Sequence, residues 1–358
     1  MFARFAQSLG ICCLLLINVA TGQLADAPDN PYRNYGTTVA VRYQVGLSVT
    51  ASRGAIRDAV GIVAVPFDCD EQEVILVEED ISPEIDGVEY RLIDGGARQM
   101  VVTIPHLANG TEAHAILTYE VRTKSILPID EALTAELVKP KKPDRDLKRY
   151  LGRSKYIQHN HSKIRRTLRD IFEAKQVEHP DDEEEDDIEL ATFDDHADDD
   201  AEPEQAETAF DADSLTDWQR VEKIYDFVQQ HVKYIEGEDQ TALEVLASGQ
   251  GDCHDVSALF VALCRADKIP ARMVWVHEHQ YPEFCLADAE GQVHWFPCES
   301  TGMRAFGELP MPRVIMQKGD NFRVPERREA LRYASEYFIA LPVGNGGKPK
   351  VDFIRRML

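Results

Sequence analysis

The first part of the chain alternates apolar and polar residues with a period of two. Apolar side chains stand at every second position from Val39 to Val49, and a similar run covers 115–121 after the turn signal Asn109-Gly110. Alternation of this kind places one face of a strand in a core and the other face in solvent. Shorter apolar runs, separated by Gly, Pro and Asp, lie at 61–65, 74–77 and 101–104. Several short strands with turns between them predict an antiparallel β-sandwich-like domain over residues 33–128.

From residue 214 the apolar pattern changes to a helical period. Thr216 and Gln219 stand three residues apart, which is the spacing of a capping box at a helix start. The apolar residues that follow recur at intervals of three and four, at Trp218, Val221, Ile224, Tyr225 and Val228. This spacing predicts an amphipathic helix with one face in a core.

A second helix is expected from Cys253 to about Asp267, with apolar residues along one face. Strand-like segments follow at 272–276, 282–286 and 293–297, and residues 287–291 form a hairpin turn between the last two. Helices followed by a sheet indicate an α+β fold, and we expect this core to cover residues 214–342. The remaining residues, 343–358, are expected to be a C-terminal tail.

The region between the two predicted domains consists of a basic segment followed by an acidic one. Residues 139–170 contain 12 Lys or Arg and 3 Asp, and we expect 129–177 to be a basic helical linker. Residues 178–213 contain 19 Asp or Glu and no Lys or Arg, which predicts a solvated, disordered acidic insert. The net charge of −24 therefore belongs mostly to this insert. Such a charge argues against nucleic acid as a partner, because phosphate binding needs clustered cations.

The N-terminus has the features of a secretory signal peptide over residues 1–22. Arg4 precedes an apolar run from Leu9 to Ala20, and small residues follow it to Gly22. The run is too short to span a bilayer comfortably, so we expect no integral membrane contact. The mature protein is expected to be exported, either periplasmic or extracellular. Its five cysteines are an odd number, which leaves at least one free thiol, and a disulfide between Cys285 and Cys298 stays open.

Cys253 stands where a thiol becomes a nucleophile. It follows Gly249 and Gly251 and opens a predicted helix, whose free N–H groups and dipole lower a thiol pKa. The two glycines are expected to let a substrate approach the backbone. A nucleophilic thiol needs a base and an orienting acceptor, for which the downstream strands offer His279 and Glu299.

Other residues compete for these roles. His277 and His294 are alternative bases, and Glu283 is a second carboxylate on the strand of His279. As a further alternative, His254 and Asp255 together with His277 and His279 are candidate ligands of a metal site. No paired Cys-x-x-Cys supports that reading, so we expect neither a metal nor another cofactor.

Three motifs resemble those of transglutaminase-like proteins. The cysteine motif begins with Gly249-Gln-Gly-Asp-Cys253 and ends with Arg265-Ala-Asp-Lys-Ile-Pro-Ala-Arg272. His279-Gln-Tyr-Pro-Glu283 matches the family pattern His-x-Trp-x-Glu with Tyr in place of Trp. Trp295-Phe-Pro-Cys-Glu-Ser-Thr301 matches Trp-x-Pro-x-Asp-x-Thr with Glu299 in place of Asp. The resemblance covers roughly 215–302, and the segment ending Val232-Lys-Tyr234 resembles the one that precedes the family's core.

The resemblance implies a papain-like fold and a cysteine enzyme of an exported bacterial type. Its members include transglutaminases, peptide N-glycanases and bacterial cysteine proteases. Cys253 would attack an amide of a peptide or protein substrate, His279 would transfer the proton, and Glu299 would orient His279. The acyl group would then pass to water, as in a protease or amidase, or to an amine. The alternative is an impaired scaffold that binds a protein partner, which the Glu299 substitution favours. The sequence leaves the oligomeric state open.

The predicted signal peptide has a direct test. When the full chain is expressed with a secretion pathway, the exported protein should begin near Gln23, because the small residues at 20–22 form the cleavage site. Intact-mass measurement of the exported protein checks this. An exported protein that retains residues 1–22 would contradict it.

Overall fold

A computed structural model describes residues 30–173 and 214–358, in which a 16-residue strand, β1 (Tyr35–Thr50), forms the centre of a four-stranded antiparallel sheet. Tyr43, Val45 and Leu47 alternate into the core, as the period of two predicts. The order of the sheet is β14 (Lys350–Met357), β1, β6 (Glu112–Ile126) and β3 (Gln72–Ile81). The expected signal peptide and acidic insert lie outside the described residues.

The second sheet is shared by the two ends of the sequence. Its N-terminal part comprises β2 (Ile56–Val65), β4 (Gly87–Ile93) and β5 (Ala97–Leu107). Its C-terminal part comprises β9 (Ala271–Val276), β10 (His279–Ala287), β11 (Val293–Pro297), β12 (Ile315–Lys318) and β13 (Tyr337–Pro342). The order is β11-β10-β9-β12-β5-β2-β13, with β4 also paired to β5. Strands β5 and β12 meet at Ala97 and Gln317, which joins the two parts.

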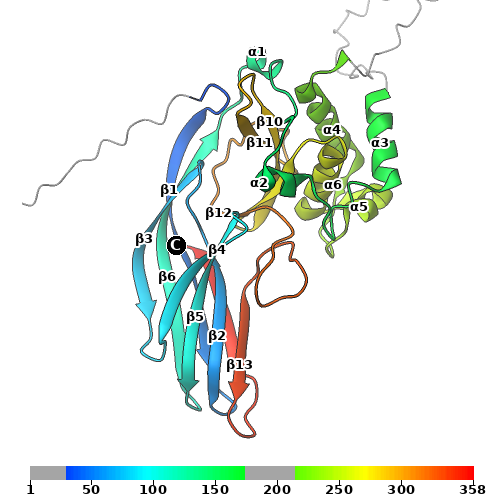
Figure 1. The fold of residues 1–358 in the computed structure, drawn as a ribbon. Helices are drawn as coiled ribbons and strands as arrows, with labels where there is room; N and C mark the ends of the chain where they lie inside the picture. Colours follow the sequence, from blue (N-terminus) through cyan, green and yellow to red (C-terminus); the bar gives the residue numbers. More distant parts are fainter. Residues whose placement is uncertain (1–29, 174–213) are drawn as a thin grey trace, which may run out of the picture. The chain divides into compact units, whose positions relative to one another are not determined.

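The two largest hydrophobic cores lie in different parts of this arrangement. Apolar side chains of β1, β2, β5 and β6 pack together between the sheets, which makes the N-terminal part a β-sandwich. A separate core lies between β9–β11 and the helices, and Figure 1 shows α3, α4, α5 and α6 grouped there. This α+β arrangement, a β-sandwich followed by a core of helices packed on β9–β11, confirms the fold class predicted from the sequence.

The helices begin and end close to the predicted positions. Thr216 caps α4 (Asp217–His231) in a capping box with Gln219, and α6 spans Cys253–Ala266. The other helices are α1 (Glu131–Thr134), α2 (Arg145–Lys148), the 3-10 turn η1 (Arg149–Leu151), α3 (Ser162–Glu173) and α5 (Ala242–Ser248). Strands β7 (Lys233–Tyr234) and β8 (Gln250–Gly251) form a short parallel pair. None of the helices in the described ranges is long and apolar enough to cross a membrane.

Two segments contribute more to the fold than their composition indicates. Helix α3, in the expected basic linker, buries Ile164, Leu168 and Phe172 in the helical core. The expected C-terminal tail contains β14, which pairs along its whole length with β1. Most side chains of β14 are exposed, so backbone hydrogen bonds hold it at the sheet edge.

A buried cluster of charges links the N-terminal segment to β9, β10 and β12. Glu283 on β10 is fully buried, and its Oε2 accepts a hydrogen bond from Arg272 Nε at 2.8 Å. Lys318 Nζ donates to Glu71 Oε2 at 2.6 Å and lies 3.4 Å from Glu283 Oε1. Arg33 pairs with Glu71. Burial raises the pKa of Glu283, but the charges of Lys318 and Arg272 outweigh it and hold that pKa below its usual value.

Removing one partner of this cluster should be strongly destabilising. Glu283→Ala leaves Arg272 without its buried counter-charge and Lys318 with Glu71 alone, and we expect a loss of about 3–5 kcal/mol in the free energy of unfolding. Urea denaturation measures it. Asp352→Ala, which breaks the exposed Lys350–Asp352 pair, is the control and should change stability by less than about 1 kcal/mol. Equal effects of the two substitutions would contradict a structural role for Glu283.

Candidate active site

Cys253 is the first residue of α6, and the residue before it shapes the helix start. Asp252 Oδ1 accepts hydrogen bonds from the backbone N–H of His254 at 2.8 Å and of Asp255 at 3.2 Å. As the first helical residue, Cys253 has a backbone N–H with no acceptor within the helix. The thiol is therefore presented at the positive end of a well-capped helix, partly exposed to solvent.

The backbone that leads into α6 is held by β7 and β8. The N–H of Ile235 donates to Gly251 O at 3.0 Å, and the N–H of Lys233 donates to Gly249 O at 2.9 Å. Gly249 has a φ of 63° at the end of α5, a conformation that favours glycine. A Cβ at Gly251 would lie 2.6 Å from Asp255 Cβ. Local packing thus accounts for both glycines, which we had expected to make room for a substrate.

His279 and Glu299 approach each other from β10 and from the end of β11. Their Nε2 and Oε1 atoms are 2.6 Å apart, and both side chains are largely buried. His279 also forms a side-chain hydrogen bond with Cys253. Because Nε2 faces Glu299, Nδ1 is the nitrogen available to the thiol. The structure therefore brings Cys253, His279 and Glu299 together in the predicted order.

Helix α4 fixes the position of Glu299. Two side chains of α4 donate hydrogen bonds to the backbone carbonyl oxygen of Glu299, Tyr225 Oη at 2.9 Å and Gln229 Nε2 at 3.1 Å. The N–H of Ser300 donates to Glu299 Oε1 at 3.2 Å, the same oxygen that faces His279. The extra methylene of Glu, compared with the Asp of the family pattern, is thus accommodated without losing contact with the imidazole.

The surroundings keep His279 protonated over a wide pH range. Burial alone would lower its pKa, but hydrogen bonds with Cys253 and Glu299 and the charges of both groups raise the pKa of His279 to about 9. The free imidazole has a pKa of about 6.5. The interaction therefore stabilises the folded protein fully below about pH 6.5, and this contribution is lost as the pH rises through about 9.

The competing residues have other partners. His277 Nδ1 lies 3.0 Å from Tyr43 Oη, and His294 Nε2 lies 2.8 Å from Asp288 Oδ2. Glu283 belongs to the buried charge cluster. These three side chains are therefore engaged away from Cys253.

The five cysteines of the described residues are free, so Cys285 and Cys298 do not form a disulfide. Burial raises the pKa of Cys69 and of Cys285 to about 12, and it raises those of Cys264 and Cys298 well above their ordinary value. These four thiols remain protonated at neutral pH. Cys253 differs from them in lying beside a cationic imidazole.

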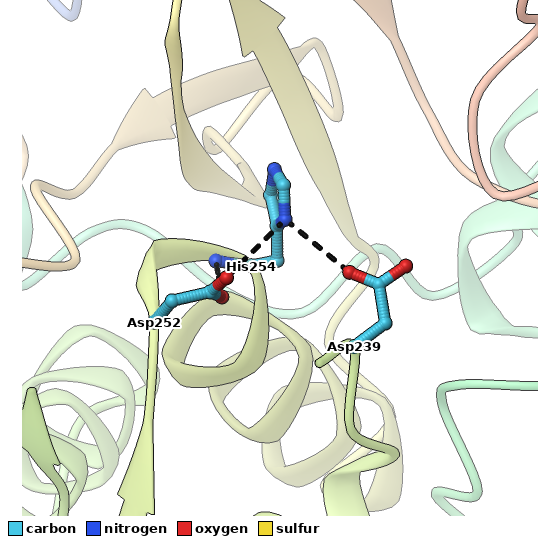
Figure 2. A group of neighbouring side chains, drawn as sticks. All are labelled: Asp239, Asp252 and His254. Carbon is cyan, nitrogen blue, oxygen red and sulfur yellow. Dashed lines mark hydrogen bonds and ion pairs between the residues drawn. The ribbon is translucent and has the colours of Figure 1, made fainter. Parts of the chain in front are cut away.

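Figure 2 shows a neighbouring group formed by Asp239, Asp252 and His254. His254 Nδ1 lies 3.6 Å from Asp239 Oδ1 and 3.7 Å from Asp252 Oδ2. Arg332 Nη1 is 3.1 Å from the same oxygen of Asp239 and supplies a positive charge there. Of the residues considered for a metal site from the sequence, only His254 takes part. His277 and His279 face other partners, and Asp255 Oδ1 accepts a hydrogen bond from the N–H of Gln240.

Sequence reasoning missed two residues that hold the Cys253 backbone. Ser257 Oγ donates to Cys253 O at 2.7 Å, and Gln280 Nε2 donates to the same oxygen at 3.2 Å. Gln280 is fully buried, and its Oε1 has no hydrogen-bond partner among the described residues. The signal that could have identified Gln280 is its side-chain amide in a strand of otherwise buried residues, because a buried polar group needs a hydrogen-bond partner.

Comparison with known proteins agrees with this architecture. Residues 205–307 match the model of the transglutaminase-like superfamily. The fold also resembles the crystal structure of "a Putative Cysteine Protease from Cytophaga hutchinsonii", with a TM-score of 0.52 and 18% sequence identity. The alignment covers 91% of this chain and 93% of that one. A search of curated proteins finds no match.

Together these observations define an α+β protein whose C-terminal core resembles the transglutaminase-like superfamily. The match to the transglutaminase-like superfamily covers residues 205–307, where the sequence motifs resemble that family. The likeness to the solved structure extends the shared fold to the β-sandwich.

Glu299 should control the protonation of His279. Glu299→Gln removes a negative charge 2.6 Å from Nε2, so the pKa of His279 should fall from about 9 toward the free value. Histidine NMR titration measures this shift. Asp288→Asn makes the same change beside His294 and should leave His279 unaffected. An unchanged His279 pKa in Glu299→Gln would show that Glu299 does not act on it.

Proposed function

We propose that the protein is a cysteine enzyme that attacks amide bonds of peptides or proteins through Cys253, His279 and Glu299. The observation that carries the proposal is the 2.6 Å contact between His279 and Glu299, together with the hydrogen bond from His279 to Cys253. A cationic imidazole beside a thiol at a helix start favours the thiolate, which is the nucleophilic form. The transglutaminase-like core adds support from the fold.

The reaction would proceed through a thioester. Cys253 Sγ forms a bond to the carbonyl carbon while its proton resides on His279. The C–N bond then breaks, and the leaving nitrogen takes that proton from His279 and departs as an amine. The thioester next reacts with water or with a second amine, whose proton passes to His279. Hydrolysis restores Cys253 and releases an acid, whereas transfer releases a new amide.

The start of α6 would stabilise the negative charge that develops on the carbonyl oxygen. The backbone N–H of Cys253 has no helical acceptor and lies beside the attacking sulfur. Ser257 and Gln280 hold the carbonyl of the same residue, so the geometry of this helix start is fixed before a substrate binds. Preorganised donors of this kind are a large contribution to acyl-transfer catalysis.

The scaffold alternative rested on Glu299 replacing the Asp of the family pattern. In this structure Glu299 contacts His279 and is held by α4, so the substitution gives no reason for lost activity. The enzyme proposal is therefore the stronger of the two.

Alkylation of Cys253 by iodoacetamide tests the proposed ion pair. In the unaltered protein, alkylation should show a fast phase below pH 8. At pH 7, His279→Ala should slow that phase about tenfold or more, because the thiol of Cys253 loses its cationic imidazole partner. Cys253→Ala should remove the fast phase. Cys69→Ala is the matched control and should retain it, since burial keeps that thiol protonated.

The same variants decide between enzyme and scaffold. Turnover of a library of peptide amides should fall at least about a thousandfold in Cys253→Ala. Incorporation of a labelled amine into product would identify transfer, and its absence during turnover would identify hydrolysis. A rate of alkylation that is indifferent to His279 would contradict the enzyme proposal and favour the scaffold.

A further inference from the structure

A cavity of about 470 Å³ lies near the end of α6, and half of its lining residues are cations. Seven of its lining side chains are Lys or Arg, and only Asp94 and Asp320 are acidic. Arg265, in the last turn of α6, lies 12 residues beyond Cys253. A rise of 1.5 Å per residue separates their backbones by roughly 18 Å. This cationic cavity is therefore distinct from the candidate active site.

Three of the seven cations have partners within the fold. Arg265 pairs with Asp320, and Lys318 pairs with Glu71 and Glu283. Arg149 Nη1 lies 3.6 Å from Asp94 Oδ1. These pairs also neutralise both acidic residues of the lining.

The other four cations, Arg145, Lys148, Arg153 and Arg323, form no ion pair with a residue that the structure describes. Three come from the segment around α2, and Arg323 comes from the loop after β12. The backbone N–H of Arg323 donates to Asp94 Oδ2 at 3.0 Å, which fixes that loop at the cavity. The fold thus collects four positive charges from distant parts of the sequence.

We propose that the cationic cavity binds a peptide segment with clustered carboxylates. Exposed ion pairs are individually weak, so useful affinity requires a ligand that presents several negative charges together. Guanidinium groups suit carboxylates because they donate two parallel hydrogen bonds. Guanidinium groups also suit phosphates, but the chain itself carries clustered carboxylates, with 19 Asp or Glu between residues 178 and 213, which favours a carboxylate ligand.

Clustered carboxylates have two sources. One is an acidic segment of another protein, which the cavity would hold away from Cys253. The other is this chain, whose sequence contains Asp181-Asp-Glu-Glu-Glu-Asp-Asp187. A ligand on the same chain has a high effective concentration and would compete with an external one. The binding itself does not depend on the chemistry at Cys253.

A labelled peptide of sequence Asp-Asp-Glu-Glu-Glu-Asp-Asp, added to the full chain, tests the proposal by fluorescence anisotropy. It should bind at low ionic strength and weaken as salt rises. Arg153→Glu/Arg323→Glu should weaken binding about tenfold or more. Arg42→Glu/Arg57→Glu changes the net charge equally on strands away from the cavity and should leave binding unchanged.

Several results would overturn the assignment. The first is that the amide peptide Asn-Asn-Gln-Gln-Gln-Asn-Asn binds as tightly as the acidic peptide. The second is that both double variants lose the same affinity for the acidic peptide. The third is that the acidic peptide binds to no form of the chain. Tighter binding of tripolyphosphate that is lost in Arg153→Glu/Arg323→Glu would replace the peptide with a phosphate ligand.

A second variant separates the two sources and removes competition. In it, all 19 Asp and Glu of residues 178–213 are replaced by the corresponding amides, so the chain length is kept. Binding of the acidic peptide should tighten about threefold or more if the chain's own residues occupy the cavity. An unchanged affinity assigns the cavity to an acidic segment of another protein.

Discussion

The fully buried carboxylate of Glu283 is the constraint on which the rest of the structure depends. It is surrounded by Arg272, Lys318 and Arg33, which come from β9, from β12 and from the start of the described chain. A carboxylate in an apolar interior is tolerated only when cations and hydrogen bonds compensate it. The cluster therefore ties these segments together in the folded sheet. His279 stands four residues before Glu283 on β10, so the cluster also anchors the strand that carries the candidate base.

The candidate site combines two rigid parts that meet at Cys253. One is the start of α6, which Asp252 caps and Ser257 and Gln280 hold. The other is the β10–β11 pair, whose end is tied to α4 through Glu299. Precise catalysis needs reacting groups held within fractions of an ångström. Placing each group on a packed helix or strand meets that need better than a loop would.

Much of the fold was predictable because local signals agreed with tertiary packing. The alternation around Tyr43 marked a strand, and the Thr216–Gln219 pair marked the start of α4. Cys253, His279 and Glu299 were found through motifs whose spacing follows from one helix and two strands. Strand β14 was missed because its stability comes from backbone pairing with β1, which side-chain patterns do not record. The charge cluster and the cationic cavity were missed because they join residues far apart in sequence, as Lys318 and Glu71 show.

The isolation of the Cys253 thiol has a consequence for its response to oxidants. The other four thiols of the described residues stay protonated and slow to react. The next cysteine on α6, Cys264, is fully buried and 11 residues further along, roughly 16 Å away. Because these thiols are protonated, a sulfenic acid formed on Cys253 meets no thiolate among the described residues that could trap it as a disulfide. Further oxidation would carry it to the sulfinic state, so that peroxide inactivates the site permanently unless an external thiol intervenes first.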